Sequence, residues 1–280
     1  MPKLTLFQGG TSGIGAKVAE QLAEQGAQIV LLVRDHTDPW TIEFIEQLRD
    51  RTENPLIYAE TCDLDSLLSI REFATKWINT TPPRRLDMVI CNAGVLAPPF
   101  SQPRETSDGI EWHWGINYLG HYHLLNLLSP AIRVQPLDRD VRIIFTTCAL
   151  YAVGKLDDAV SEVSSWKAFG ASKLALMMTA QDLQTQFKKS DRGGVTNIRV
   201  YCVDPGLVRT PLLRGFLSMG SVWGLLLYLI MWPIWYLILK SPLEGAQTVL
   251  HCAMTPVDYN KRAEDGWTSA GYYRDCKEAV

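Results

Sequence analysis

A glycine-rich turn directly after the first strand-like run of the chain constrains the fold more than any other feature. Residues 4–7 form a short, mostly apolar run, and Val18 and Leu22, after the turn, have helical spacing. Glycines let a backbone approach a pyrophosphate, whose charge the free amides and positive end of the next helix then hold. A second apolar run at residues 29–33 completes the pattern of a βαβ unit that binds a dinucleotide, which a merely flexible turn would not require. The residues expected to line the pyrophosphate are Gly9, Thr11, Ser12, Gly13, Ile14 and Gly15.

The end of the second apolar run bears on which nicotinamide cofactor would bind. A free ribose 2′-hydroxyl usually meets an acidic residue at this point, whereas a 2′-phosphate needs a cation. Val33 has no side-chain acceptor, and Arg34 carries a planar fork of donors suited to phosphate. The sequence therefore favours NADP(H) over NAD(H). The alternative is a solvated surface arginine that pairs with Asp35.

Length and composition agree with one domain over residues 1–280. A chain of 280 residues can bury a sizeable core, and its alternating strand and helix patterns predict an α/β fold with a doubly wound parallel sheet, the Rossmann fold. The net charge of −3 excludes a broad basic surface for nucleic acid. The six cysteines are scattered, which favours reduced thiols in a cytosol-facing protein. No metal site is expected, because His121 and His123 would not face each other on a helix.

Five motifs in order resemble the short-chain dehydrogenase/reductase family over nearly the whole chain. The glycine turn departs from the family pattern at one position, where Gln8 replaces a threonine. The segment 62–64 resembles the adenine-contacting end of the third strand, and 92–94 carries the Asn-Ala-Gly signature after the fourth strand. Segment 116–121 resembles the helix whose asparagine belongs to the catalytic set, and segment 204–210 resembles the loop that closes over the nicotinamide. The cofactor contacts that this resemblance implies are Asp63, Leu64, Asn92, Ala93, Gly94, Lys173, Pro205, Gly206, Val208 and Thr210.

Three segments of the chain resemble the retinol-dehydrogenase-like branch of that family, namely residues 117–121, 241–248 and 271–276. The likeness implies a lipophilic alcohol or aldehyde as substrate without selecting one. Members of that branch often carry an N-terminal membrane anchor. Here the first strand is expected to begin by Leu4 and to leave no room for such an anchor.

The expected active site keeps two of the family's four catalytic roles. In the family, a tyrosine moves the hydroxyl proton, a lysine four residues later lowers its pKa, a serine holds the substrate oxygen, and an asparagine anchors a water. Lys173 fills the lysine position and Asn117 the asparagine position. Cys148 stands at the serine position, where a thiol is a weak donor, and Phe169 stands at the tyrosine position without any proton to give. Loss of a positioned acid or base costs on the order of 10²–10⁴ in rate.

The pattern Tyr-x-x-x-Lys does occur elsewhere in the chain, at Tyr151 and Lys155, but there it does not fit the role of the helical tyrosine. Gly154 and the charged residues after it predict a loop, whereas the true pair needs one face of a long helix. Tyr151 is nevertheless a candidate to reach the site from that loop as a substitute donor. Thr147 and Cys148 are further candidates, and their alternative is a buried threonine and cysteine at a strand end without a catalytic role.

Residues 216–239 form a long uncharged apolar run that is interrupted by Pro233. An apolar run of about 18 residues or more is a candidate to span a membrane. A single crossing is not expected here, because the segments after it must return to the same sheet. A helical hairpin, or a helix lying in the membrane interface between Arg214 and Lys240, fits better. The alternative is a buried lid over the substrate site or an oligomer interface.

Together these features lead to two hypotheses of different classes. The first is an NADP(H)-dependent oxidoreductase for a lipophilic alcohol, aldehyde or ketone, held through 216–239 at the cytosolic face of the endoplasmic reticulum or at a lipid droplet. The second is a pseudoenzyme, an NADP(H)-binding membrane-associated scaffold or sensor. The cofactor residues are intact, which fits both hypotheses, and Phe169 is the feature that the pseudoenzyme hypothesis explains. A homodimer is compatible with either.

Overall fold

The computed structural model describes residues 3–81, 84, 86–136, 139–159, 163–190, 197–256 and 271–279. One eight-stranded sheet runs through this part in the order β3-β2-β1-β4-β5-β6-β7-β8. All neighbouring strands are parallel except β7 and β8. The strands are β1 (Leu4–Gln8), β2 (Gln28–Val33), β3 (Ile57–Thr61), β4 (Met88–Cys91), β5 (Val141–Thr146), β6 (Ile198–Asp204), β7 (Gly271–Arg274) and β8 (Lys277–Glu278).

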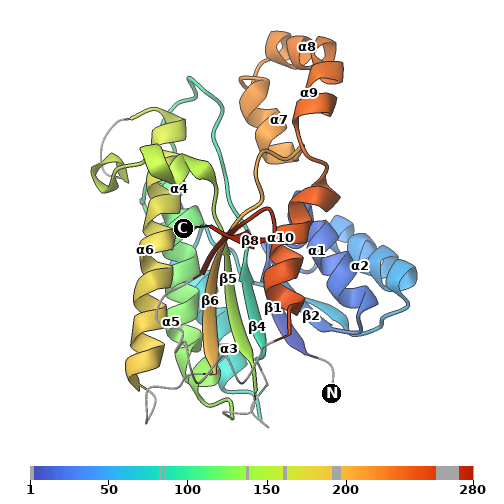
Figure 1. Cartoon of the computed structure of the whole chain (residues 1–280), viewed down its shortest axis with the longest axis vertical. Coiled ribbons are helices and arrows are strands. Elements are labelled where there is room, and N and C mark those ends of the chain that lie inside the picture. Colours follow the sequence, from blue (N-terminus) through green and yellow to red (C-terminus); the bar gives the residue numbers. More distant parts are fainter. Residues whose placement is uncertain are drawn as a thin grey trace.

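Helices cover both faces of the sheet, as the sequence predicts for a doubly wound fold (Figure 1). Helices α1, α2 and α10 pack on one face, and α3, α5 and α6 pack on the other. The bounds of the main helices are α1 (Gly13–Glu24), α2 (Pro39–Thr52), α3 (Leu67–Ile78), α4 (Trp112–Trp114), α5 (Gly120–Arg133), α6 (Ser165–Ser190) and α10 (Pro242–Met254). The short turns are the π-helical η1 (Gly115–Leu119) and the 3₁₀-helical η2 (Ala149–Val153) and η3 (Leu156–Ala159).

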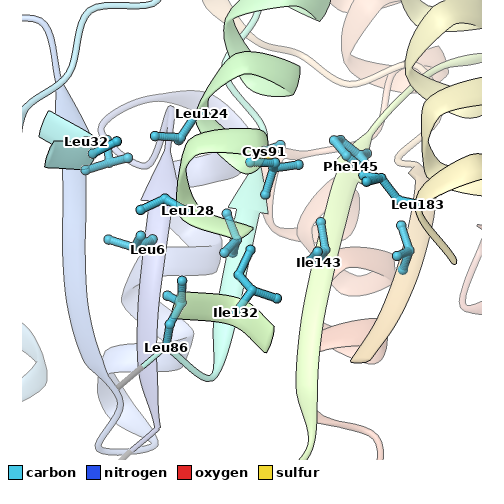
Figure 2. Close-up of a cluster of buried hydrophobic side chains, with 14 of the residues drawn as sticks. Leu6, Leu32, Leu86, Cys91, Leu124, Leu128, Ile132, Ile143, Phe145 and Leu183 are labelled. Atoms are coloured by element: carbon cyan, nitrogen blue, oxygen red, sulfur yellow. The ribbon is translucent and has the colours of Figure 1, made fainter. Parts of the chain in front are cut away.

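Strands β1, β2, β4, β5 and β6 are buried along almost their whole length, because most of their residues are apolar. On α5, Leu124, Leu128 and Ile132 recur at intervals of four and form one stripe that packs onto the sheet. Figure 2 shows this stripe against side chains from several strands. The labelled members of this core are Leu6, Leu32, Leu86, Cys91, Leu124, Leu128, Ile132, Ile143, Phe145 and Leu183.

The strand order places a ligand crevice at the carboxyl ends of β1 and β4. From β1 the chain builds outward through β2 and β3, and it then returns to add β4 on the other side of β1. At such a reversal the two flanking loops leave in opposite directions, which opens a crevice at the edge of the sheet. The glycine turn follows β1, and the Asn-Ala-Gly segment follows β4, so both lie at this crevice.

Residues 211–238 form an arch that projects from the body of the protein (Figure 1). Its helices are α7 (Pro211–Leu217), α8 (Val222–Ile230) and α9 (Trp232–Ile238). Pro233 lies in the first turn of α9, where its missing N–H costs nothing. The stem is closed by backbone pairing, with Arg209 N donating to Lys240 O at 2.9 Å and Lys240 N donating to Leu207 O at 2.9 Å.

No helix of the described residues is both long enough and apolar enough to cross a membrane by itself. Helices α7 and α8 meet those criteria only as a pair, and they are bent by 109° relative to each other. The sequence argues against a single uninterrupted span, and the structure forms three short helices here, α7, α8 and α9. Val222, Trp223 and Leu237 point their side chains into solvent and are 81–84% exposed.

Candidate active site

The glycine turn is compact because its glycines touch other backbone atoms. Gly9 and Gly13 have φ values of 73° and 54°, which side chains disfavour. A Cβ on Gly15 would lie 1.8 Å from the Gly9 carbonyl oxygen, and a Cβ on Gly9 would lie 2.7 Å from the Ala93 Cα. The turn thus packs directly on α1 and on the segment after β4. This is the close cradle that a pyrophosphate requires, so the residues present fit a dinucleotide.

The amino end of α1 leaves its first amides open to a ligand. Ser12 occupies the N-cap position, but its side chain makes no capping hydrogen bond. Gly13 faces Thr210, whose Cγ2 would lie 3.2 Å from a Cβ at position 13. Val208 and Ile14 both lie against Gly245, where a Cβ would be 2.6 Å from the Val208 side chain and 3.3 Å from the Ile14 side chain. The predicted nicotinamide loop, which contains Pro205 and Gly206, therefore lies beside the predicted pyrophosphate turn, which also contains Thr11.

Arg34 is exposed directly after β2, at the same edge of the sheet. The expected alternative, a pair with Asp35, is not formed, because Asp35 Oδ1 accepts from Thr37 N at 2.8 Å and from Thr37 Oγ1 at 2.7 Å. These hydrogen bonds lower the pKa of Asp35. None of the ion pairs between described residues involves Arg34. Its guanidinium is therefore available to a ligand.

The predicted adenine-side residues follow β3. Asp63 Oδ1 accepts from Asp65 N at 3.0 Å, which forms a tight turn at the strand end. Leu64 is buried against Gly120 of α5, where a Cβ would meet the Leu64 side chain at 3.1 Å. Asp63 is partly exposed and Leu64 supports the turn from below.

The Asn-Ala-Gly segment connects the cofactor side of the site to the catalytic side. Asn92 Nδ2 donates to Gly9 O at 2.9 Å, and Asn92 Oδ1 accepts from Thr146 Oγ1 at 3.1 Å. Gly94 lies against two residues of the predicted catalytic set. A Cβ there would be 3.3 Å from Asn117 Oδ1 and 3.6 Å from Lys173 Nζ. Asn117 and Lys173 therefore converge on one small region.

Lys173 and Asn117 are both buried and held by backbone groups. Lys173 Nζ donates to Thr146 O at 2.9 Å, and burial lowers the pKa of this amine. Asn117 lies in the π-helical turn η1, a form of helix that often occurs at functional sites. Its Oδ1 accepts from Val95 N at 2.7 Å, and its Nδ2 donates to Val95 O at 3.0 Å and to Ser172 Oγ at 3.2 Å.

Phe169 lies one helical turn before Lys173 on α6, where the family has its tyrosine. Its ring is buried, and the Lys173 ammonium lies 5.5 Å from the ring centroid. The His113 ring packs edge-on against it at 6.5 Å. His113 Nε2 accepts from Ala97 N at 3.0 Å, so its proton is on Nδ1, which donates to Glu111 Oε1 at 2.7 Å. Both ring nitrogens of His113 are therefore already hydrogen-bonded, and His113 is not a substitute proton donor.

Cys148 is the cap residue of η2 and is partly exposed. Burial raises the pKa of its thiol, and the Lys173 charge opposes that effect. Cys148 therefore keeps its proton near pH 7, and it lies close to Lys173. Thr147 is buried, and its hydroxyl has no hydrogen-bond partner among the described residues.

Tyr151 lies in η2, which is a short 3₁₀ turn and not the irregular loop that Gly154 indicates. The turn forms because Tyr151 N donates to Cys148 O at 3.1 Å and Gly154 N donates to Tyr151 O at 3.3 Å. Lys155 lies beyond the end of η2, so the two residues do not share a helix face. The Tyr151 ring packs edge-on at 5.7 Å against Tyr272, whose hydroxyl donates to Asp204 Oδ2 at 3.2 Å.

Comparison with known proteins identifies the family. The family profile described as short chain dehydrogenase matches residues 3–219. The chain belongs to the short-chain dehydrogenase family. The oxidoreductase pbr1 of Schizosaccharomyces pombe, described as uncharacterized, is 45% identical over 263 residues, covering 90% of this chain and 70% of that protein. Retinol dehydrogenase 14 of Mus musculus is 33% identical over 291 residues, covering 99% of this chain and 78% of that protein.

These likenesses confirm the retinol-dehydrogenase-like branch that the motifs indicated. A short chain dehydrogenase of Shigella flexneri, solved with NADP, shares the fold with a TM-score of 0.67 at 20% identity, covering 97% of this chain and 95% of that one. In this short-chain dehydrogenase, sequence reasoning did not anticipate His113 and Glu111. The only local signal is that Glu111 and His113 are two residues apart, just before the turn that holds Asn117. The role of this pair is clear only from the contact between the His113 and Phe169 rings.

Proposed function

We propose that this chain is an NADP(H)-dependent oxidoreductase for a lipophilic alcohol, aldehyde or ketone, working at a membrane or lipid-droplet surface. The observation that carries the proposal is the convergence of Asn117 and Lys173 at Gly94, next to a glycine turn shaped for a pyrophosphate. Bound NADP(H) would supply the hydride. The chain would bind and orient the cofactor and hold the substrate oxygen near Cys148 and Lys173.

The preference for NADP(H) rests on the surroundings of Arg34. Val33 offers no acceptor to a ribose hydroxyl, and the Asp35 carboxylate is already engaged by Thr37. Arg34 is exposed and makes no ion pair with another described residue. A guanidinium in that state suits a 2′-phosphate, which it can bind with two parallel hydrogen bonds.

The Arg34→Ala variant is expected to bind NADPH about 10- to 100-fold more weakly, the size of a charge-assisted hydrogen bond. Its affinity for NADH should stay within about twofold, since NADH has no 2′-phosphate. Titration calorimetry of both cofactors would measure this. Lys17→Ala, which removes a cation paired with Glu20 on α1, is the matched control and should change neither affinity. Equal losses for the two cofactors in Arg34→Ala would contradict the assignment.

The membrane setting and the lipophilic substrate rest on the arch. Its residues between Arg214 and Lys240 carry no charge, and many of their large apolar side chains face solvent. An uncharged apolar surface of this kind is unfavourable in water and favourable at the boundary of lipid acyl chains. The arch leaves the body next to Thr210 and Val208, which belong to the predicted nicotinamide loop. A substrate dissolved in lipid would thus meet the site from the arch. The cytosolic face of the endoplasmic reticulum and the lipid-droplet monolayer are the surfaces that we propose.

A second function, an NADP(H)-binding scaffold or sensor without turnover, is favoured specifically by Phe169. The ring fills the position beside Lys173 with no exchangeable proton. Tyr151, the substitute that the sequence offered, packs against Tyr272 and not against Phe169 or Lys173 in the described ring contacts. Under this alternative the site would bind cofactor and leave the substrate unchanged.

Cofactor oxidation by the full chain held in detergent separates the two functions. We expect turnover of NADPH with long-chain aldehydes or ketones, and its loss in Lys173→Ala. Lys167→Ala, which removes an exposed lysine from the same helix, is the control and should keep its rate. Tight NADPH binding with no turnover across the substrate panel would establish the scaffold or sensor instead.

A further inference from the structure

Gln8 and His121 lie 113 residues apart in the chain and contact each other in the interior. Gln8 is the last residue of β1, at the position where the family pattern has threonine, and His121 is the second residue of α5. Both side chains are buried. His121 Nδ1 faces Gln8 Oε1, and His121 Nε2 lies 2.9 Å from the Ala93 carbonyl oxygen.

The two ring nitrogens of His121 face oxygen acceptors, which one neutral imidazole cannot satisfy. A neutral ring has one N–H, and burial lowers the pKa of His121 to about 4, so the ring is neutral near pH 7. At the same time, Gln8 Nε2 is buried with no hydrogen-bond partner. An amide nitrogen without a partner, together with an amide oxygen opposite a ring nitrogen that has no proton to give, indicates that the amide is turned the other way.

Turning the Gln8 amide by 180° gives each of the two His121 ring nitrogens a suitable partner. Gln8 Nε2 then donates to His121 Nδ1, and the His121 Nε2 proton is free to donate to Ala93 O.

This chain of hydrogen bonds ends on the segment that joins the two halves of the site. The Gln8 backbone carbonyl accepts from Ala93 N at 3.0 Å, so Gln8 holds Ala93 from one side directly and from the other through His121. Ala93 touches Gly9 of the glycine turn, and the next residue, Gly94, touches Asn117 and Lys173. A shift of Ala93 would therefore move the cofactor cradle relative to the catalytic residues.

We propose that Gln8 and His121 are positioning residues that act as one unit to hold the Asn-Ala-Gly segment against the cofactor cradle. The hydrogen bonds run from Gln8 to His121 and from His121 to Ala93. The part that concerns the cofactor rests on the proposed function, whereas the hydrogen-bond directions do not.

Nitrogen NMR of the full chain with ¹⁵N-labelled histidine tests the directions at pH 7 without any change to the site. We expect the proton of His121 on Nε2 and a bare Nδ1. The His121 signal is assigned as the one that Gln8→Met shifts. A proton on Nδ1, or on both nitrogens, would overturn the proposal.

Cofactor affinity tests the positioning role. Gln8→Met keeps the volume and removes the amide, and His121→Leu removes the ring. Each is expected to weaken NADPH binding about tenfold, the scale of one or two lost hydrogen bonds. The double variant should lose no more than about tenfold, because the two residues act together. A hundredfold, additive loss in the double variant, or unchanged affinity in both single variants, would overturn the proposal.

Thr5→Val is the matched control, since Thr5 is another buried polar residue of β1 whose hydroxyl lacks a hydrogen-bond partner. Its NADPH affinity should stay within about twofold of the wild type. If the wild-type chain binds no NADPH at all, the proposed function fails, and the NMR result alone then decides the hydrogen-bond directions.

Discussion

The Phe169→Tyr variant is expected to oxidise NADPH with a lipophilic aldehyde about 10²- to 10⁴-fold faster than the wild-type chain, the usual contribution of a positioned acid. The phenol would stand one helical turn before Lys173, whose ammonium already lies 5.5 Å from the ring centroid. A cation at that range favours the ionised phenol and lowers its pKa. Single-turnover absorbance of NADPH, with cofactor and substrate saturating, is the measurement.

Two further variants assign any gain to the phenol and its partner. Phe169→Leu should match the wild type, because neither side chain has a proton to transfer. Adding Lys173→Ala to Phe169→Tyr should remove most of the gain. If Phe169→Tyr gives no gain while NADPH still binds, proton transfer does not limit the site through this position, and Tyr151→Phe then shows whether Tyr151 supplies the proton. Activity that exists only in Phe169→Tyr would favour the scaffold or sensor.

Replacing Val222, Trp223 and Leu237 together by serine is expected to reduce partition onto phospholipid vesicles by on the order of 10³-fold. These side chains are 81–84% exposed on the arch and would enter the lipid boundary. At about 1.5 kcal/mol each, the transfer of the three side chains amounts to about 4.5 kcal/mol, and about 1.4 kcal/mol corresponds to tenfold. Cosedimentation with phosphatidylcholine vesicles gives the partition directly.

A matched triple variant elsewhere separates the arch from general apolarity. Trp40, Ile42 and Leu68 are exposed apolar residues of α2 and α3, and their replacement by serine should leave vesicle binding unchanged. The arch variant should keep its NADPH affinity, since the altered side chains lie outside the cofactor cradle. Equal losses of vesicle binding in the two triple variants would refute the arch as the contact surface.

The sequence predicts the sheet and the glycine turn well, because their signals are local. Uninterrupted apolar runs indicate strands buried on both faces. Glycines that cluster directly after such a run indicate a tight turn in which side chains would clash. At Gly15, for example, the Gly9 carbonyl leaves no room for a side chain. The expected parallel sheet with helices on both faces is confirmed by the strand order and by the family.

The parts that sequence reasoning did not reach depend on contacts between distant residues. Nothing near Gln8 indicates that its side chain meets His121, because 113 residues separate them and the pairing exists only after β1 and α5 pack. The π-helical turn at Asn117 inserts one extra residue per turn without a distinct pattern of apolar positions. Residues 216–239 carry no charge and are almost all apolar, so their periodicity does not reveal where α8 ends and α9 begins.

The closed stem of the arch makes the segment between its two ends exchangeable. Residues 207–209 pair with Lys240 through backbone groups, so the entry and exit of the arch stay together whatever sequence lies between them. The closure free energy of such a loop changes slowly with its length. The family profile ends at residue 219, inside the arch. A change in the length or composition of this loop is therefore expected to leave the glycine turn and the loop after β6 in place.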